Sequence, residues 1–167
     1  MIKRVLVTGG SGFVGKELIR KILSSTTWEV INIDIVPSFI DGVTDIQHDL
    51  STGSINVPPI DACFHLASKV GGILLNQKNE LIDYNNIVNH STYLICKPYN
   101  PVFVFVSTIN VFEKSCNVSS IKEPTLAYSI SKLRGEEFLK SCEFSHFYIV
   151  RPSNIFGRSQ IGTFCSY

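Results

Sequence analysis

Tyr128 and Lys132 stand four residues apart in the stretch "YSISK", so on a helix their side chains would lie on one face. A phenol has a pKa of about 10 and is a poor base at neutral pH, but a nearby ammonium group lowers that pKa. Upstream, the apolar run "VFVFV" places Ser107 and Thr108 at the end of an expected strand. These residues could transfer a proton to or from a hydroxyl group. Tyrosine and lysine at this spacing are also common on exposed helices, so the surrounding motifs decide the interpretation.

Glycine is concentrated in the stretch "VLVTGGSGFVGKEL", between an apolar run and a helix-like segment that begins near Phe13. Between a strand and a helix, glycines allow a tight turn, a close approach of the backbone to a pyrophosphate, and close packing of the helix on the strand. The pyrophosphate would lie at the N-terminus of the helix. Gly10, Gly12 and Gly15 match G-x-G-x-x-G, whereas Gly9, Gly12 and Gly15 match G-x-x-G-x-x-G. Both spacings stay open, and the alternative to a dinucleotide site is an ordinary glycine-rich turn.

Asp34 ends the apolar run that follows this helix-like segment. A carboxylate at that place can accept a hydrogen bond from the 2′-hydroxyl of an adenosine ribose but repels a 2′-phosphate. The glycine loop and the residues just after Asp34 contain no Arg or Lys, which an NADP site usually supplies. The sequence therefore favours NAD, the alternative being an ordinary aspartate at a strand end or helix cap.

Short apolar, β-branched runs alternate with longer segments of helical period, which is typical of a parallel sheet with helices on both faces. The expected strands are Arg4–Thr8, Glu29–Asp34, Asp45–His48, Ala62–Leu66, Val102–Ser107 and Phe147–Arg151. The expected helices are Phe13–Ser24, Gln77–Cys96 and Leu126–Cys142. This pattern predicts an α/β fold, a Rossmann-type doubly wound parallel sheet, formed by one dinucleotide-binding domain over residues 1–167.

Two connections stand out between these elements. The stretch "STGSINVPPID", residues 51–61, is too short and too rich in Gly and Pro for a full helix, so one crossover is expected to be abbreviated. Residues 113–125 read as one long polar loop before the last helix, and such loops are often functional.

The composition excludes several classes of function. Fifteen basic and fourteen acidic residues give a net charge of +1 without a block of like charge, so nucleic acid is not an expected partner. The apolar runs are far shorter than a membrane span, so a membrane partner is not expected. The apolar run in "MIKRVLVTGG" is interrupted by glycine too early for a signal peptide, so we expect a cytoplasmic location. Five dispersed cysteines without a C-x-x-C pair indicate neither a disulfide framework nor a metal site. His65, inside the run "ACFHLAS", is expected at a strand end or in the core.

Taken in order, the motifs resemble the extended short-chain dehydrogenase/reductase family, the NAD-dependent sugar-nucleotide epimerases and dehydratases. Single motifs of this kind are common, whereas the whole series in order is specific. The series comprises "TGGSGFVG" (8–15), Asp34, "HDL" (48–50), "FHLAS" (64–68), Asn86, "STINVF" (107–112), "YSISK" (128–132) and "RPSNIFG" (151–157).

The resemblance implies a role for each matching residue. Tyr128 would be the acid or base of a hydride transfer at a sugar carbinol, Lys132 would also hold the nicotinamide ribose, and Thr108 would hydrogen-bond the reacting oxygen. Asn154 would contact the nucleotide-sugar substrate, and the two long helices near residues 77–96 and 126–142 would pair in a homodimer. The cofactor contacts would be Gly9, Gly12, Phe13, Val14, Gly15, Asp34, Asp49, Leu50, Leu66, Ala67, Ser68, Tyr128 and Lys132.

Departures from the family's patterns narrow the activity. The stretch "LASKVGGI" (66–73) is similar to the GDP-fucose synthase branch, but Asn110 stands where that branch has a cysteine, and Asp34 argues against its NADPH. The dehydratases place an Asp-Glu pair where this chain has Ile109-Asn110. A 4-epimerase or 4-reductase therefore fits better than a dehydratase. Members of the family continue well beyond "RPSNIFG" into a substrate-binding portion, so we expect either a fragment or a truncated protein, with a non-catalytic NAD-binding module as the alternative function.

Overall fold

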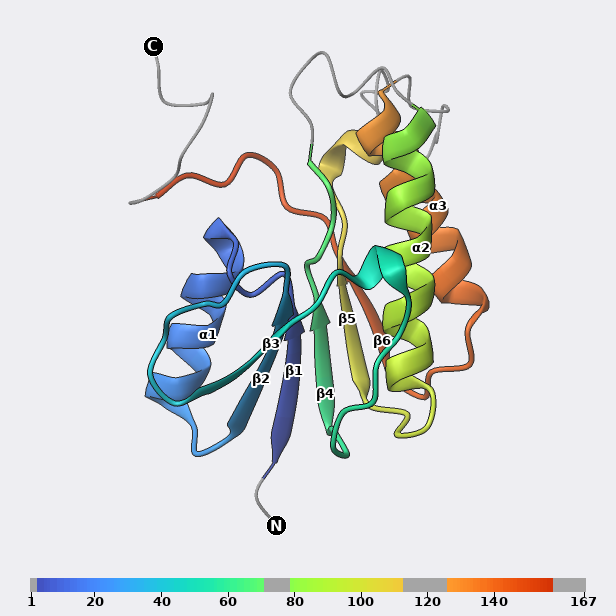
Figure 1. Ribbon diagram of the computed structural model, residues 1–167. Helices are drawn as coiled ribbons and strands as arrows, with labels where there is room; N and C mark the ends of the chain where they lie inside the picture. The colour runs from blue at the N-terminus through green and yellow to red at the C-terminus, as the bar shows by residue number, and fades with distance from the viewer. Residues whose placement is uncertain (1–2, 71–78, 113–125, 158–167) are drawn as a thin grey trace.

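The computed structural model describes residues 3–70, 79–112 and 126–157, and within these residues six strands form one sheet (Figure 1). Every pairing is parallel, and the strand order is β3-β2-β1-β4-β5-β6. This order is that of the doubly wound Rossmann fold, which confirms the predicted fold class. The strands are β1 (Arg4–Thr8), β2 (Glu29–Asp34), β3 (Val43–Gln47), β4 (Ala62–His65), β5 (Val102–Val106) and β6 (Phe147–Val150).

Helices cover both faces of the sheet (Figure 1). Helix α1 (Phe13–Ser25) packs on one face, where Ile19 and Ile22 join a cluster with Val5 and Val7 of β1. Helices α2 (Asn79–Cys96) and α3 (Ala127–Ser141) pack side by side on the other face, over a cluster that includes Leu6. Because neighbouring residues of β1 point to opposite faces and both faces are covered, its central residues Val5, Leu6 and Val7 are all apolar.

The predicted elements are all present, with shifted ends. The third strand begins two residues earlier than predicted, at Val43, and the last four strands each end one residue earlier. The abbreviated crossover is confirmed, because residues 48–61 contain only the short turn η1 (Leu50–Thr52). The connection between β2 and β3, residues 35–42, also lacks a helix, which was not predicted from the sequence. The predicted polar loop 113–125 and the start of the helix predicted from Gln77 lie outside the described residues.

The strand order determines where the motifs meet. Between β1 and β4 the order of strands reverses, and in such sheets ligands bind at the carboxyl ends of the strands next to this point. The glycine loop follows β1, residues 66–70 follow β4, and Ser107 and Thr108 follow β5, so all three segments lie at the same edge. Among the described residues, no helix is long and apolar enough to span a membrane.

Candidate functional site

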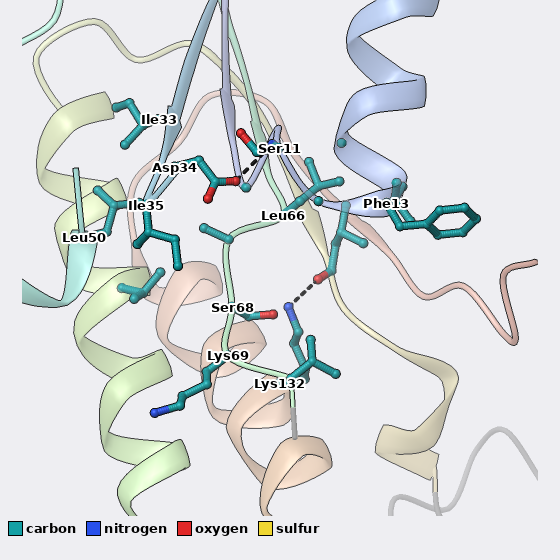
Figure 2. Close-up of a pocket in the computed structure, with 18 of the residues that line it drawn as sticks. Ser11, Phe13, Ile33, Asp34, Ile35, Leu50, Leu66, Ser68, Lys69 and Lys132 are labelled. Carbon is teal, nitrogen blue, oxygen red and sulfur yellow. Dashed lines mark hydrogen bonds between the residues drawn. The ribbon is translucent and has the colours of Figure 1, made fainter. Parts of the chain in front are cut away.

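A cavity of about 760 Å³ opens at this edge of the sheet, between the glycine loop, the segment after β4 and the start of α3 (Figure 2). Asn154 is exposed and does not line the cavity among the described residues, although its neighbours Ser153 and Ile155 do. All the other predicted site residues line it: Gly9, Gly12, Phe13, Val14, Gly15, Asp34, Asp49, Leu50, Leu66, Ala67, Ser68, Thr108, Tyr128 and Lys132.

The glycine loop has the geometry that an approaching ligand needs. Gly9 has a φ of 74°, which side chains disfavour, and a Cβ there would lie 2.6 Å from the backbone nitrogen of Ala67. A Cβ on Gly15 would overlap the carbonyl oxygen of Gly9. Gly9, Gly12 and Gly15 line the cavity, whereas Gly10 packs against the Asn32 side chain. The structure therefore selects the G-x-x-G-x-x-G spacing at the cavity wall.

The N-terminus of α1 faces the cavity. The helix begins at Phe13, and Gly12 precedes it as the N-cap residue. The first turn, residues 13–16, is made of Phe, Val, Gly and Lys and therefore contains no acidic side chain that would repel an anion. The free N–H groups at this helix end and the helix dipole favour an anion. This is the arrangement that holds a phosphate or pyrophosphate at a helix N-terminus.

Two carboxylates, Asp34 and Asp49, also line the cavity. Asp34 accepts a hydrogen bond from the Ser11 N–H at 3.0 Å, which orients its carboxylate beside the glycine loop (Figure 2). Asp49 accepts hydrogen bonds from the Ser51 N–H at 2.8 Å and from the Tyr84 hydroxyl at 3.0 Å. Burial alone would raise the pKa of Asp49, but these hydrogen bonds outweigh it and hold that pKa below its ordinary value. Both carboxylates are therefore oriented by their neighbours.

Lys132 of α3 is only 3% exposed, and its ammonium group contacts residues of the sheet. Its Nζ donates a hydrogen bond to the carbonyl oxygen of Val106 at 2.8 Å (Figure 2) and lies 5.0 Å from the centroid of the Phe105 ring. Burial lowers the pKa of Lys132 to about 7, because the charged form is desolvated. The amine therefore loses its proton much more readily than an exposed lysine does.

Tyr128 differs from the expectation drawn from its spacing to Lys132. Burial raises the pKa of Tyr128 above its ordinary value, and a hydrogen bond with Ser68 offsets only part of this effect. The ammonium of Lys132 lies 5.8 Å from the centroid of the Tyr128 ring and is directed to the Val106 carbonyl. The predicted lowering of the Tyr128 pKa by Lys132 is therefore wrong for this arrangement, because desolvation dominates.

Thr108 is nearly buried at the end of β5 and lines the same cavity as Tyr128. Its Oγ1 accepts a hydrogen bond from the Asn110 N–H at 3.3 Å, so the hydroxyl can donate its own hydrogen to an oxygen in the cavity. The cavity thus holds a phenol, a buried amine and a hydroxyl beside a site with the features of a dinucleotide cradle.

A buried amide that no sequence motif indicates joins two walls of the cavity. Asn85 of α2 accepts a hydrogen bond from the Lys69 N–H at 2.7 Å and donates one to the Lys69 carbonyl oxygen at 3.1 Å. It also donates to Ser131 Oγ at 3.0 Å, and Ser131 donates to the carbonyl oxygen of Tyr128 at 2.7 Å. Asn86, which carried part of the resemblance, lies instead in a separate groove between α2 and α3. Only the rotation of α2 in the fold distinguishes the two asparagines.

A buried ion pair holds the segment after β6 beside α3. Glu136 is wholly buried and accepts hydrogen bonds from Arg151 Nε at 2.8 Å and Arg151 Nη2 at 2.5 Å. Burial by itself would raise the pKa of Glu136, but Arg151 lowers it below the ordinary value. The residues that follow Arg151, namely Pro152, Ser153 and Ile155, line the cavity.

His65 lies in the core at the end of β4. Its Nδ1 lies 2.6 Å from Thr8 Oγ1, and its Nε2 lies 2.9 Å from Asn89 Oδ1. Burial lowers the pKa of His65 to about 3, so the ring is neutral. The expected place at a strand end in the core is confirmed. In the described part of the chain, His, Cys, Asp and Glu residues do not gather in groups of three or more that could hold a metal.

Residues 5–164 match the NAD dependent epimerase/dehydratase family. The chain is 26% identical to the dTDP-D-glucose 4,6-dehydratase of Homo sapiens, over 95% of this chain and 53% of that protein. It is 30% identical to an uncharacterized UDP-glucose epimerase of Bacillus subtilis, over 80% of this chain and 50% of that protein. The chain therefore spans about half the length of the curated relatives that it matches.

Solved structures confirm the fold. The UDP-glucuronic acid 4-epimerase from Bacillus cereus in complex with NAD is similar over 94% of this chain and 58% of its own, with a TM-score of 0.77 and 21% identity. A UDP-glucose 4-epimerase is similar over 89% of this chain and 51% of its own, with a TM-score of 0.77 and 18% identity.

Proposed function

Because the chain belongs to the NAD dependent epimerase/dehydratase family, we propose that it binds NAD in the cavity and supports hydride transfer on a nucleotide-activated sugar. One observation carries the proposal. Tyr128, Lys132 and Thr108 line the same cavity as the glycine loop and Asp34, although these residues come from distant parts of the chain. We propose reaction at C4 of the sugar, in a 4-epimerase or a 4-reductase.

The residues of the cavity fit NAD. The missing Cβ atoms of Gly9 and Gly15, together with the N-terminus of α1, suit the pyrophosphate. The Asp34 carboxylate would accept from the adenosine ribose, and Asp49 and Leu50 would lie by the adenine. Further hydrophobic and small residues would follow the rest of the dinucleotide to the nicotinamide ribose, held by Lys132. Leu66, Ala67 and Ser68 would lie along this path, which ends at Tyr128, whereas Phe13 and Val14 would lie at the pyrophosphate.

The chain's own groups would carry the proton. NAD, when bound, supplies the hydride acceptor for the carbon that bears the hydroxyl. The Tyr128 oxygen takes the hydroxyl proton while the Thr108 hydroxyl donates a hydrogen bond to the same substrate oxygen. Burial disfavours the phenolate of Tyr128, and Lys132 is directed to the Val106 carbonyl oxygen, so loss of the phenol proton is the costly part of this step. Ile109 and Asn110 offer no acid and base for dehydration, and Asn154 stays a prediction for the substrate contact.

The direct test is to incubate the protein with NAD and a panel of UDP-, GDP- and dTDP-sugars. Formation of a 4-epimer would be followed by NMR, and any reduced cofactor by absorbance. We expect a new epimer or a reduced cofactor with at least one sugar. Binding of NAD without turnover of any sugar would support the alternative of a non-catalytic NAD-binding module, and failure to bind NAD would contradict both functions.

Asp34 is expected to set the preference between the two nicotinamide cofactors. The unmodified protein should bind NAD more tightly than NADP, because the carboxylate accepts from a ribose hydroxyl and repels a 2′-phosphate. Asp34→Ala should narrow the preference by weakening NAD binding and relieving the repulsion. Titration calorimetry with both cofactors measures this difference. Equal affinities in the unmodified protein, or tighter binding of NADP, would contradict the assignment.

We also propose a homodimer formed through the outer faces of α2 and α3. A groove of about 420 Å³ between these helices is lined by residues that include His90, Arg134 and Phe138. On α2, Ile87 and Leu94 are 46% and 42% exposed and lie seven residues apart, so they share one side of the helix. Ile82, also on α2, is buried and therefore does not belong to this surface.

Light scattering at micromolar concentration is therefore expected to give the mass of a dimer. Ile87→Lys should shift the mass toward the monomer, because it places a charge in the apolar contact. Tyr148→Lys, which changes an exposed residue of the edge strand β6, should leave the mass unchanged. A monomer in the unmodified protein would contradict the dimer.

A further inference from the structure

Asn32 is a polar residue in the middle of β2 with only 1% of its surface exposed. Its Oδ1 accepts a hydrogen bond from the Gly10 N–H at 2.9 Å. Its Nδ2 donates to Ser11 Oγ at 3.1 Å and to Asp45 Oδ1 at 2.7 Å. An amide nitrogen has two hydrogens, so both donors are used. Asn32 therefore joins two consecutive residues of the glycine loop to β3.

Asp45 continues the connection from β3 to the residues after β2. Its Oδ1 also accepts from the Ser38 N–H at 3.0 Å, and its Oδ2 accepts from Ser38 Oγ at 2.9 Å. Burial alone would raise the pKa of Asp45, but the hydrogen bonds from Asn32 and Ser38 outweigh it, so that pKa lies below its ordinary value. The carboxylate is charged at neutral pH, which strengthens each of these hydrogen bonds.

The segment held by Ser38 forms a wall of the cavity. Residues 35–42 join two adjacent parallel strands, a connection that ordinarily takes a dozen residues or more. Within this segment Ile35 and Val36 line the cavity, and the Val36 carbonyl oxygen accepts from Ser11 Oγ at 2.6 Å. Ser11 also donates its N–H to Asp34 (Figure 2). The glycine loop, Asp34 and this wall are thus tied to one another.

We propose that Asn32 and Asp45 are positioning residues for the half of NAD that carries adenosine and pyrophosphate. The inference rests on the function proposed above. In the described part of the chain, both side chains lie behind the cavity wall rather than in it. Asn32 holds Gly10 and Ser11 on one side, and Asp45 holds Ser38 on the other. The pair therefore sets the spacing between the pyrophosphate cradle and the ribose and adenine wall.

The same bonds could instead serve only the stability of the sheet, and the two roles predict different results. A stabilising role predicts a lower free energy of unfolding with unchanged ligand affinity in the folded protein. A positioning role predicts weaker binding of ADP, which contains only the affected half of NAD, at temperatures where the variant is fully folded. It also predicts faster amide exchange at Gly10 and Ser11, whose positions depend on the Asn32 side chain.

Asn32→Leu removes the amide while keeping a side chain of similar size. Because it leaves the buried Gly10 N–H and the Asp45 carboxylate with one partner fewer, we expect roughly tenfold weaker binding of both NAD and ADP by titration calorimetry. Amide exchange measured by NMR should accelerate at Gly10 and Ser11. Tyr99→Phe is the matched control, because it removes a hydrogen bond to the Val57 carbonyl at the opposite edge of the sheet. It should leave both affinities unchanged.

Exchanging the two groups provides a second test that does not depend on Asn32→Leu folding. Asn32→Asp alone places two carboxylates in contact, and their repulsion should weaken ADP binding. Adding Asp45→Asn places an amide donor on β3 opposite the new carboxylate on β2. The double variant should therefore recover part of the lost affinity for ADP.

Three results would overturn the proposals, and they are distinguishable. Unmodified protein that binds neither NAD nor ADP would overturn the proposed function and this inference with it. Unmodified protein that binds both, with a folded Asn32→Leu variant that matches its affinities and its Gly10 exchange, would overturn the inference alone. A double variant, Asn32→Asp with Asp45→Asn, that recovers none of the ADP affinity lost by Asn32→Asp would also overturn the inference.

Discussion

Replacing Tyr128 with phenylalanine is expected to lower turnover by roughly two to four orders of magnitude, the usual contribution of a positioned acid or base. The ring remains, so packing against Lys132 and the cavity wall is kept while the ionisable oxygen is lost. The affinity for NAD should be nearly unchanged, because the contacts proposed for most of the dinucleotide lie on other segments. The expected signature is thus a fall in kcat without a matching loss of cofactor binding.

The measurement combines titration calorimetry with NAD and the sugar-panel assay for the unmodified protein and the variant. Tyr148→Phe serves as the control, because this substitution makes the same chemical change away from the cavity. Tyr148 is a 55% exposed residue of β6. It should leave turnover and NAD affinity unchanged. Turnover that survives Tyr128→Phe would remove Tyr128 from the mechanism.

Arg151→Met is expected to lower the free energy of unfolding by about 3–5 kcal/mol at neutral pH, the usual result of removing one partner from a buried ion pair. The wholly buried Glu136 carboxylate would lose the two hydrogen bonds from Arg151. Lys140 cannot replace them, because its Nζ lies 3.6 Å from Glu136 Oε2 and its side chain is largely exposed. Lys140→Met, the control, should cost less than about 1 kcal/mol.

The loss of unfolding free energy caused by Arg151→Met should depend on pH. In the unmodified protein the folded-state pKa of Glu136 is lowered, so its stabilising contribution is present above the unfolded pKa of about 4.3 and is lost as the pH falls through the folded pKa. Without Arg151, burial would raise the pKa of Glu136 in the folded state, and protonation would relieve the uncompensated charge. The penalty of Arg151→Met should therefore shrink as the pH falls.

Urea unfolding of both proteins at several pH values measures this penalty. A penalty below about 1 kcal/mol at neutral pH, where the pair is charged, would show that the ion pair contributes no more than an exposed one. A penalty that stays constant between neutral and acidic pH would show that the charge of Glu136 is not its cause.

The sequence by itself determined the sheet and the edge at which the site lies. Uninterrupted apolar runs such as Val5–Val7 require cover on both faces, and runs of this kind separated by helices form parallel strands. Parallel strands that share helical crossovers have their carboxyl ends at one edge, so Gly9, Asp34 and Thr108, which follow or end strands, could be placed together in advance. The start of β3 was predicted two residues late, although Val43 and Thr44 are β-branched residues that favour a strand and directly follow the turn residues Asp41 and Gly42.

The tertiary structure decided what depends on contacts between distant segments. Spacing alone could not choose between Gly9 and Gly10, because the choice depends on Ala67 and Asn32, which belong to other strands and loops. The pair of Asn32 and Asp45 was equally hidden, since thirteen positions separate them and only the register of β2 on β3 brings them side by side.

The electrostatics of the site were also decided by the fold. The four-residue spacing of Tyr128 and Lys132 correctly put both side chains at one cavity, and it also led to the expectation that the lysine lowers the pKa of the tyrosine. The pKa of each group depends on how much water surrounds it and on which partners it has, and these come from β5 and from Ser68 rather than from α3. Periodicity reports which residues share a face, whereas desolvation is a property of the packed molecule, and this is why the direction of the Tyr128 shift could be known only from the tertiary structure.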